Sequence, residues 1–219
     1  MAYLSTRLQV IHDLLPKGVI ADIGSDHGKL MIALFRSGKL TKGYAIENKI
    51  GPYNRLVKAL EKEGLIDTII PLFSDGIQDL PIDVKHIVLA GMGGDLIVEI
   101  LKKHPEKLKY VSTIVVDAHG AVAKVREEIS QMGYAIAEEK MVKEDDKFYE
   151  IIKFIKADIA AYSEEDLEFG PILRVEKSAT FKEKYIQRIE EIDKLLLKEL
   201  PTSRIEELVN ERNRINNVL

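Results

Sequence analysis

The sequence predicts an α/β protein built on a doubly wound, mostly parallel sheet. Up to residue 155, apolar segments of strand length alternate with amphipathic segments of helical spacing. This alternation is typical of a parallel sheet that is covered by helices on both faces. The exception is a pair of adjacent β-rich segments, residues 134–142 and 148–155, separated only by the acidic turn Glu144-Asp145-Asp146. They predict an antiparallel hairpin at the end of the sheet.

The first elements are expected to be a helix, a strand and a second helix. An apolar helical face over residues 4–15 ends at Pro16-Lys17-Gly18. The apolar run of residues 19–21 ends in Asp22 and leads into the polar loop of residues 24–28, after which apolar residues recur at helical spacing. The remaining strands are expected at residues 42–47, 68–73, 86–90 and 113–116, and the remaining helices of this part at 52–63, 96–101 and 122–132.

The first loop has the chemistry of a ligand site. Gly24 can adopt a positive φ and lets a ligand approach the backbone, while the following helix N-terminus presents N–H groups that suit a carboxylate or phosphate. Asp26 stands where the dinucleotide fingerprint has a glycine. Its carboxylate repels a pyrophosphate but can accept hydrogen bonds from an ammonium group. A plain strand–turn–helix connection is the alternative interpretation.

A C-terminal helical hairpin is expected over residues 161–219, after a sheet domain of residues 1–160. A seam of large apolar residues steps along the first helix at coiled-coil spacing. Pro201 breaks it, and Thr202 or Ser203 is the expected N-cap of the second helix. The seam consists of Phe181, Tyr185, Ile189, Ile192 and Leu196.

The composition is that of a globular protein: 219 residues, 46% hydrophobic and 31% charged, with a net charge of −4. No apolar run approaches the roughly 18 residues that span a bilayer. The absence of cysteine excludes disulfides and thiolate metal ligands, and the five histidines are not paired at ligand spacing, so no metal site is expected. Because the N-terminus also lacks a secretory apolar core, the expected location is the cytoplasm. The oligomeric state is not defined by the sequence.

Acidic and glycine residues follow successive strands, where open α/β sheets bind their ligands. Glu47 is placed to accept hydrogen bonds from the two hydroxyls of a ribose, and Asp75 from the amine of an adenine. Gly91-Met92-Gly93 leaves room for a close approach to the backbone. Solvated strand-end acids and a simple tight turn are the alternatives. Together these features favour S-adenosylmethionine over NAD.

Three motifs give the chain a wider resemblance. ADIGSDHGKL (21–30), LAGMGGDLI (89–97) and EDDKFYEII (144–152), followed by FGPIL, resemble the bacterial tRNA (adenine-22-N1)-methyltransferase family, TrmK. The resemblance implies a Rossmann-like class I methyltransferase fold with strand order 3-2-1-4-5-7-6 and a C-terminal helical pair. It also implies methylation of N1 of an adenosine in tRNA with S-adenosylmethionine as cofactor.

The same resemblance implies the cofactor-binding residues. The first strand and the loop after it contribute the first set of residues. The ends of the second and third strands contribute the residues that bind the ribose and the adenine, and the end of the fourth strand contributes the residues that flank the methyl group. The candidates are Asp22, Gly24, Ser25, Asp26, His27, Glu47, Asn48, Asp75, Gly76, Gly91, Met92 and Gly93.

The chain departs from the family after the fifth strand. Where better-known members carry Gln-Pro-Asn, it has Asp117-Ala118-His119, at a position that faces the transferred methyl in this fold. Asp26 and Asp117 are the catalytic candidates, since a carboxylate can accept the N6 amine of the target base. A structural role for Asp26 in the turn, and a surface strand-end position for Asp117, are the alternatives. The departure leaves open a methyltransferase for another RNA or a small molecule, or a cofactor-binding interaction protein.

RNA would have to be held by local cations, because the chain is acidic overall. From residue 163 on there are 10 basic and 13 acidic residues, so the helical hairpin is not a basic arm. The candidate cations are Arg7, Lys17, Lys29, Lys177, Lys182, Lys184 and Arg188.

Overall fold

A single sheet organises the part of the chain that the computed structural model describes, residues 4–157 and 161–219. Its strands are β1 (Gly18–Ile23), β2 (Leu40–Glu47), β3 (Ile69–Phe73), β4 (His86–Met92), β5 (Thr113–Ala118), β6 (Tyr134–Glu144) and β7 (Lys147–Lys156). They are ordered β3-β2-β1-β4-β5-β7-β6. The first five are parallel, and β7 runs antiparallel between β5 and β6. The predicted fold and strand order are confirmed.

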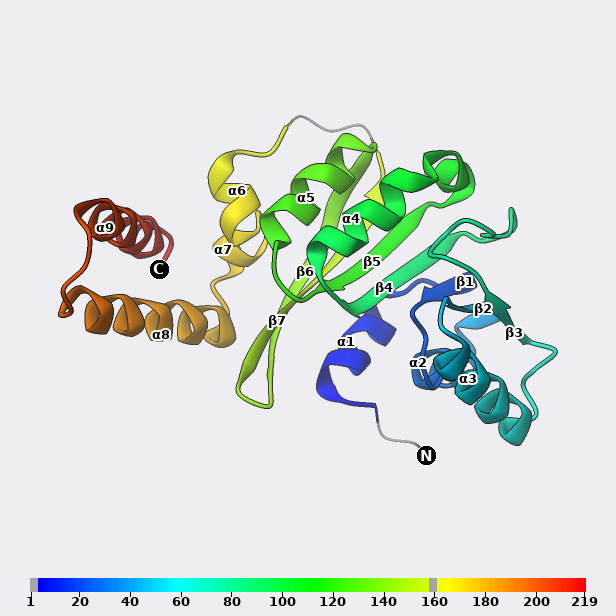
Figure 1. Ribbon diagram of the computed structural model, residues 1–219. Helices are drawn as coiled ribbons and strands as arrows, with labels where there is room; N and C mark the ends of the chain where they lie inside the picture. Colours follow the sequence, from blue (N-terminus) through cyan, green and yellow to red (C-terminus); the bar gives the residue numbers. More distant parts are fainter. Residues whose placement is uncertain (1–3, 158–160) are drawn as a thin grey trace.

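Helices cover both faces of the sheet (Figure 1). On one face lie α1 (Thr6–Leu14), α2 (Lys29–Arg36) and α3 (Ile50–Glu63). On the other lie α4 (Gly94–Lys103), the 3-10 helix η1 (Pro105–Tyr110) and α5 (Val122–Gln131). Each face has its own apolar core, which explains why the central strands read as continuous apolar runs.

Strands β4 and β5 extend beyond their apolar runs, so two expected boundaries are wrong. Gly91 and Met92 belong to β4, and Asp117 lies inside β5 rather than after it. A bulge at Gly91, whose φ is +74°, lets the ladder continue from the Ala90–Asp117 pair to Met92 and Ala118. The antiparallel partner β7 also extends along β5 as far as Asp117.

The hairpin turn is formed by Asp145 and Asp146, whose φ values are +48° and +56°. Two consecutive left-handed residues make the turn that matches the twist of antiparallel strands, and aspartate tolerates this conformation. The predicted hairpin is therefore correct, with strands slightly longer than expected.

The C-terminal region contains four helices among the described residues: α6 (Glu164–Phe169), α7 (Leu173–Glu176), α8 (Ala179–Leu196) and α9 (Thr202–Val218). The predicted pair corresponds to α8 and α9, which extend away from the sheet (Figure 1). Arg188 of α8 donates to both carboxylate oxygens of Glu211 in α9, at 2.7 and 3.0 Å. The domain boundary expected after residue 160 adjoins residues 158–160, which lie outside the described residues, and the division into two domains stays a prediction.

The predicted N-cap of α9 is wrong. The helix already begins at Thr202, and Pro201 occupies the cap position without a side-chain hydrogen bond. The backbone N–H groups of Arg204 and Ile205 donate to the Pro201 carbonyl, at 2.9 and 3.1 Å. The carbonyl of Pro201 therefore accepts the first hydrogen bonds of the helix, and the fixed φ of proline is compatible with a helix N-terminus.

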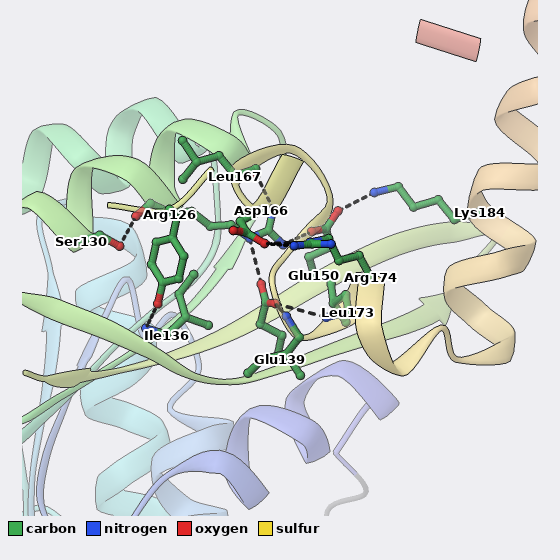
Figure 2. Close-up of polar contacts among 12 residues, drawn as sticks. Arg126, Ser130, Ile136, Glu139, Glu150, Asp166, Leu167, Leu173, Arg174 and Lys184 are labelled. Carbon is green, nitrogen blue, oxygen red and sulfur yellow. Dashed lines mark hydrogen bonds and ion pairs between the residues drawn. The ribbon is translucent and has the colours of Figure 1, made fainter. Parts of the chain in front are cut away.

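A buried ionic cluster joins the sheet to the C-terminal helices (Figure 2). Arg126 of α5 donates to Glu139 of β6 at 2.8 Å and to Glu150 of β7 at 2.5 Å, and all three side chains are at most 5% exposed. Lys184 of α8 donates to the other oxygen of Glu150 at 2.5 Å. The cluster therefore connects α8 to β7 of the sheet.

Candidate active site

The first loop adopts an unusual backbone conformation. Gly24, Asp26 and Gly28 all have positive φ, +77°, +45° and +65°. The N–H groups of Gly24 and Ser25 donate to the carbonyl of Ile46 in β2, at 2.9 and 3.3 Å. The loop is thus tied to the neighbouring strand. The left-handed conformation of Asp26, a non-glycine residue, was not predicted.

Glu47 at the end of β2 is hydrogen-bonded to the backbone of this loop. The residue is 7% exposed, and its Oε1 accepts the backbone N–H of Asp26 at 2.5 Å. Its Oε2 accepts no hydrogen bond from the described residues. The residue predicted to bind a ribose therefore keeps one acceptor free while the other fixes the backbone of the loop.

A cavity of about 330 Å³ opens beside the loop. Six of the predicted cofactor residues line it, together with Arg7 of α1, which the prediction did not include among them. Burial raises the pKa of Asp22, at its wall, to about 6, and the charge of Glu47 adds to this effect. An ammonium group placed there would be stabilised by Asp22. The six residues are Asp22, Gly24, Ser25, Asp26, His27 and Gly91.

A larger groove of about 1010 Å³ runs between α1, α2 and α3. Of the predicted cofactor residues it shares only His27 with the smaller cavity. Its walls are mostly apolar, and the acidic residue that lines it, Glu63, is already paired with Arg36. We therefore place the site at the smaller cavity.

The residues predicted for the adenine end are also brought together. Asn48 donates to Asp75 Oδ1 at 3.1 Å, and Lys103 of α4 donates to Asp75 Oδ2 at 2.7 Å. The Lys103 hydrogen bond, followed by that of Asn48, lowers the pKa of Asp75. A Cβ added to the next residue, Gly76, would lie 2.8 Å from the Ile100 side chain, so glycine is required there. Lys103 was not predicted.

The glycine-rich segment after Ala90 lies against the first loop. A Cβ added at Gly24 would lie 3.1 Å from the terminal methyl of Met92. A Cβ added at Gly93 would meet nothing within 4 Å, so the backbone there is open to a bound molecule. The free oxygen of Glu47, the acidic wall of the cavity and this open backbone fit the ribose, ammonium and methyl-bearing parts of S-adenosylmethionine.

The two catalytic candidates occupy different environments. Asp117 is fully buried, and its Oδ2 accepts a hydrogen bond from Arg7 Nη1 at 2.7 Å. Burial raises the pKa of Asp117, and the charge of Arg7 opposes this shift. The Asp26 carboxylate is 54% exposed and pairs with Arg55 at 3.0 Å and His27 at 3.5 Å. A surface position for Asp117, considered from the sequence, is therefore wrong.

Comparison with known proteins identifies the family of this chain. The TrmK family profile, described as tRNA (adenine(22)-N(1))-methyltransferase, matches residues 20–218. The chain belongs to the TrmK family. The tRNA (adenine(22)-N(1))-methyltransferase of Bacillus subtilis is 33% identical over 194 residues, which cover 85% of this chain and 82% of that protein. The resemblance stated from the sequence is confirmed.

Two similar solved structures contain the cofactor or its product. Streptococcus pneumoniae Sp1610 in complex with S-adenosyl-L-methionine is 29% identical, with a TM-score of 0.91, over 99% of this chain and 100% of that chain. M. capricolum TrmK in complex with S-adenosyl-homocysteine is 28% identical, with a TM-score of 0.88, over 98% of this chain and 96% of that chain. The predicted enzyme class and cofactor are confirmed.

Of the candidate RNA-binding cations in this TrmK chain, three are engaged in ion pairs. Arg7 pairs with Asp117, Lys184 with Glu150, and Arg188 with Glu211 and Glu191. The four others, Lys17, Lys29, Lys177 and Lys182, make no ion pair with the described residues.

Within residues 4–157 and 161–219, no helix is long and apolar enough to cross a membrane. The same residues contain no group of three or more potential ligands that could hold a metal ion.

Proposed function

We propose that this chain binds S-adenosylmethionine across the carboxyl ends of β1 to β4 and methylates N1 of adenosine 22 in tRNA. The observation that carries the proposal is the convergence of Asp22, Glu47 and Asp75 at one edge of the sheet in a chain that belongs to the TrmK family. A tRNA substrate also agrees with the cytoplasmic location expected from the sequence.

We assign the cofactor contacts by the chemistry of each position. Glu47 accepts hydrogen bonds from the ribose hydroxyls with its free oxygen. Asp22 accepts from the ammonium group. Asp75 accepts from the adenine amine, with Asn48 and Lys103 keeping its carboxylate in place. The N-terminus of α2 lies at the same loop and suits the carboxylate of the methionine part.

When bound, S-adenosylmethionine supplies an electrophilic methyl group. Adenine N1 has an available lone pair, so the protein has to orient the base and exclude water rather than supply a strong base. Methylation at N1 places a positive charge on the base. We assign Asp117 to stabilise this charge from its buried position beneath Arg7, because a buried carboxylate acts strongly on a neighbouring charge. Asp26 is the weaker candidate, since its carboxylate is 54% exposed and solvent screens its charge.

The target adenosine has to leave its stack in the tRNA to reach such a position. The base-binding group must then recognise the extruded base by its edge.

Replacing Asp117 tests this assignment. We expect Asp117→Asn to lower kcat for tRNA methylation by about 100-fold, the order expected for loss of a buried charged interaction near the reacting atoms. Affinity for S-adenosylmethionine, measured by calorimetry, should stay close to that of the unmodified chain. Asp83→Asn, which removes a half-exposed carboxylate paired with Lys42, serves as the control. Unchanged kcat in Asp117→Asn would rule out the assigned role.

A further inference from the structure

Arg7 connects α1 to the end of β5. Its Nη1 lies 2.7 Å from Asp117 Oδ2 and 2.9 Å from His119 Nε2. Its guanidinium carbon lies 4.9 Å from the centre of the Tyr149 ring, in a cation–π contact. A Cβ added at Gly91 would lie 3.7 Å from the same Nη1. One side chain therefore contacts the catalytic candidate, the aromatic ring beside it and the glycine segment next to the cavity.

The partner of Arg7 is unusual because it is fully buried. Asp117 is 0% exposed, and its Oδ1 has no hydrogen-bond partner among the described residues. An unpaired carboxylate in such a place would take up a proton, since burial disfavours the charged form. Arg7 and His119 oppose this protonation, and Arg7 does so by direct contact. Ionisation of Asp117 thus depends on a residue from the N-terminal helix.

The remaining charged groups around Arg7 do not replace this function. Its Nε lies 3.9 Å from Glu144 Oε2 in β6, and that carboxylate is partly exposed. Tyr149 of β7 offers its ring to Arg7 rather than a charge. Asp22 shares the cavity wall with Arg7 on the opposite element, β1. Removal of Arg7 would therefore leave the imidazole of His119 and the backbone of Gly91 as the groups that favour the charged form of Asp117.

We propose that Arg7 is a positioning residue for methyl transfer: it keeps the buried Asp117 carboxylate charged and in one orientation beside the cavity, where its negative charge acts on the base that becomes positive. This inference rests on the proposed function, because it assumes that the charge of Asp117 acts on the base during methyl transfer. The arginine compensates for the acidic residue at the position where this chain departs from Gln-Pro-Asn.

The test compares Arg7→Gln and Arg7→Lys with the unmodified chain. We expect Arg7→Gln to lower kcat at pH 7 by about tenfold or more, with little change in affinity for S-adenosylmethionine. Without the guanidinium the pKa of Asp117 rises further, so more of it is neutral at pH 7. The activity of Arg7→Gln should therefore recover as the pH rises, and the acid limb of its pH–activity profile should shift to higher pH. Arg7→Lys keeps the charge, and we expect it to retain most of the activity and the original profile.

Three controls separate this role from others. Arg36→Gln removes a surface arginine paired with Glu63 and should change neither kcat nor the profile. His119→Gln identifies the part of the pH profile that belongs to the imidazole. Arg7→Gln in an Asp117→Asn background should lower kcat no further than Asp117→Asn alone, because both changes act through one carboxylate.

Several results would overturn the inference. Unchanged kcat in Arg7→Gln would do so, as would an equal loss at every pH, which indicates a purely structural role. A loss confined to cofactor affinity would instead make Arg7 a cofactor ligand. Failure of the proposed function is distinguishable, since it appears as absence of 1-methyladenosine with the unmodified chain.

Discussion

Replacement of Arg126 by leucine is expected to lower the free energy of unfolding by about 3–5 kcal/mol, the range measured when one partner of a buried ion pair is removed. The guanidinium is fully buried between Glu139 and Glu150, and it also donates to the Leu167 carbonyl at 2.9 Å. Without it both carboxylates stay buried and lose their main counter-charge. Lys184 reaches only Glu150, so Glu139 is left with the N–H groups at the start of α7.

Thermal unfolding measures this effect. A loss of that size corresponds to a Tm lower by about 10 °C for a chain of this length. Arg204→Leu is the matched control, because its ion pair with Glu207 is exposed and such pairs contribute about 1 kcal/mol or less. If Arg126→Leu unfolded within about 2 °C of the unmodified chain, the cluster would not anchor the C-terminal helices as described.

Replacement of Glu47 by alanine is expected to weaken S-adenosylmethionine binding by about 100-fold or more, since hydrogen bonds to a charged group contribute about 1.5–3 kcal/mol each. The substitution removes the assigned ribose acceptor. It also removes the acceptor for the Asp26 N–H, so the first loop loses this hydrogen bond to the end of β2. Both losses act on the cofactor before any chemistry takes place.

Calorimetric titration with S-adenosylmethionine checks this result. Glu138→Ala is the control, because Glu138 lies on β6 away from the cavity and pairs with Lys153 at the surface. Its cofactor affinity should equal that of the unmodified chain. A Glu47→Ala variant that bound the cofactor with undiminished affinity would show that the ribose is held elsewhere.

The sequence predicts the sheet and the acidic edge of the site well, for a physical reason. Buried parallel strands produce apolar runs that are visible in the chain, and their carboxyl ends meet at one edge. Asp22, Glu47 and Asp75 each end or follow such a run, so their approach to one another can be expected without coordinates. The hairpin can also be predicted from the sequence, because the residues of its turn are adjacent in the chain.

The missed features depend on contacts between distant segments. Arg7 and Asp117 are 110 residues apart, and Lys103 reaches Asp75 over 28 residues, so neither pair leaves a local pattern. The extension of β4 depends on a bulge that only strand pairing reveals. Helices α6 and α7 are 6 and 4 residues long, too short to display helical periodicity.

Methyl transfer to defined tRNA transcripts tests the central claim most directly. Labelled S-adenosylmethionine is supplied with an unmodified transcript that carries adenosine at position 22, and with the same transcript carrying guanosine there. We expect 1-methyladenosine in the first transcript and none in the second. Equal labelling of both transcripts would contradict methylation at position 22, and cofactor binding without any labelled nucleoside would contradict the assignment of tRNA as the substrate.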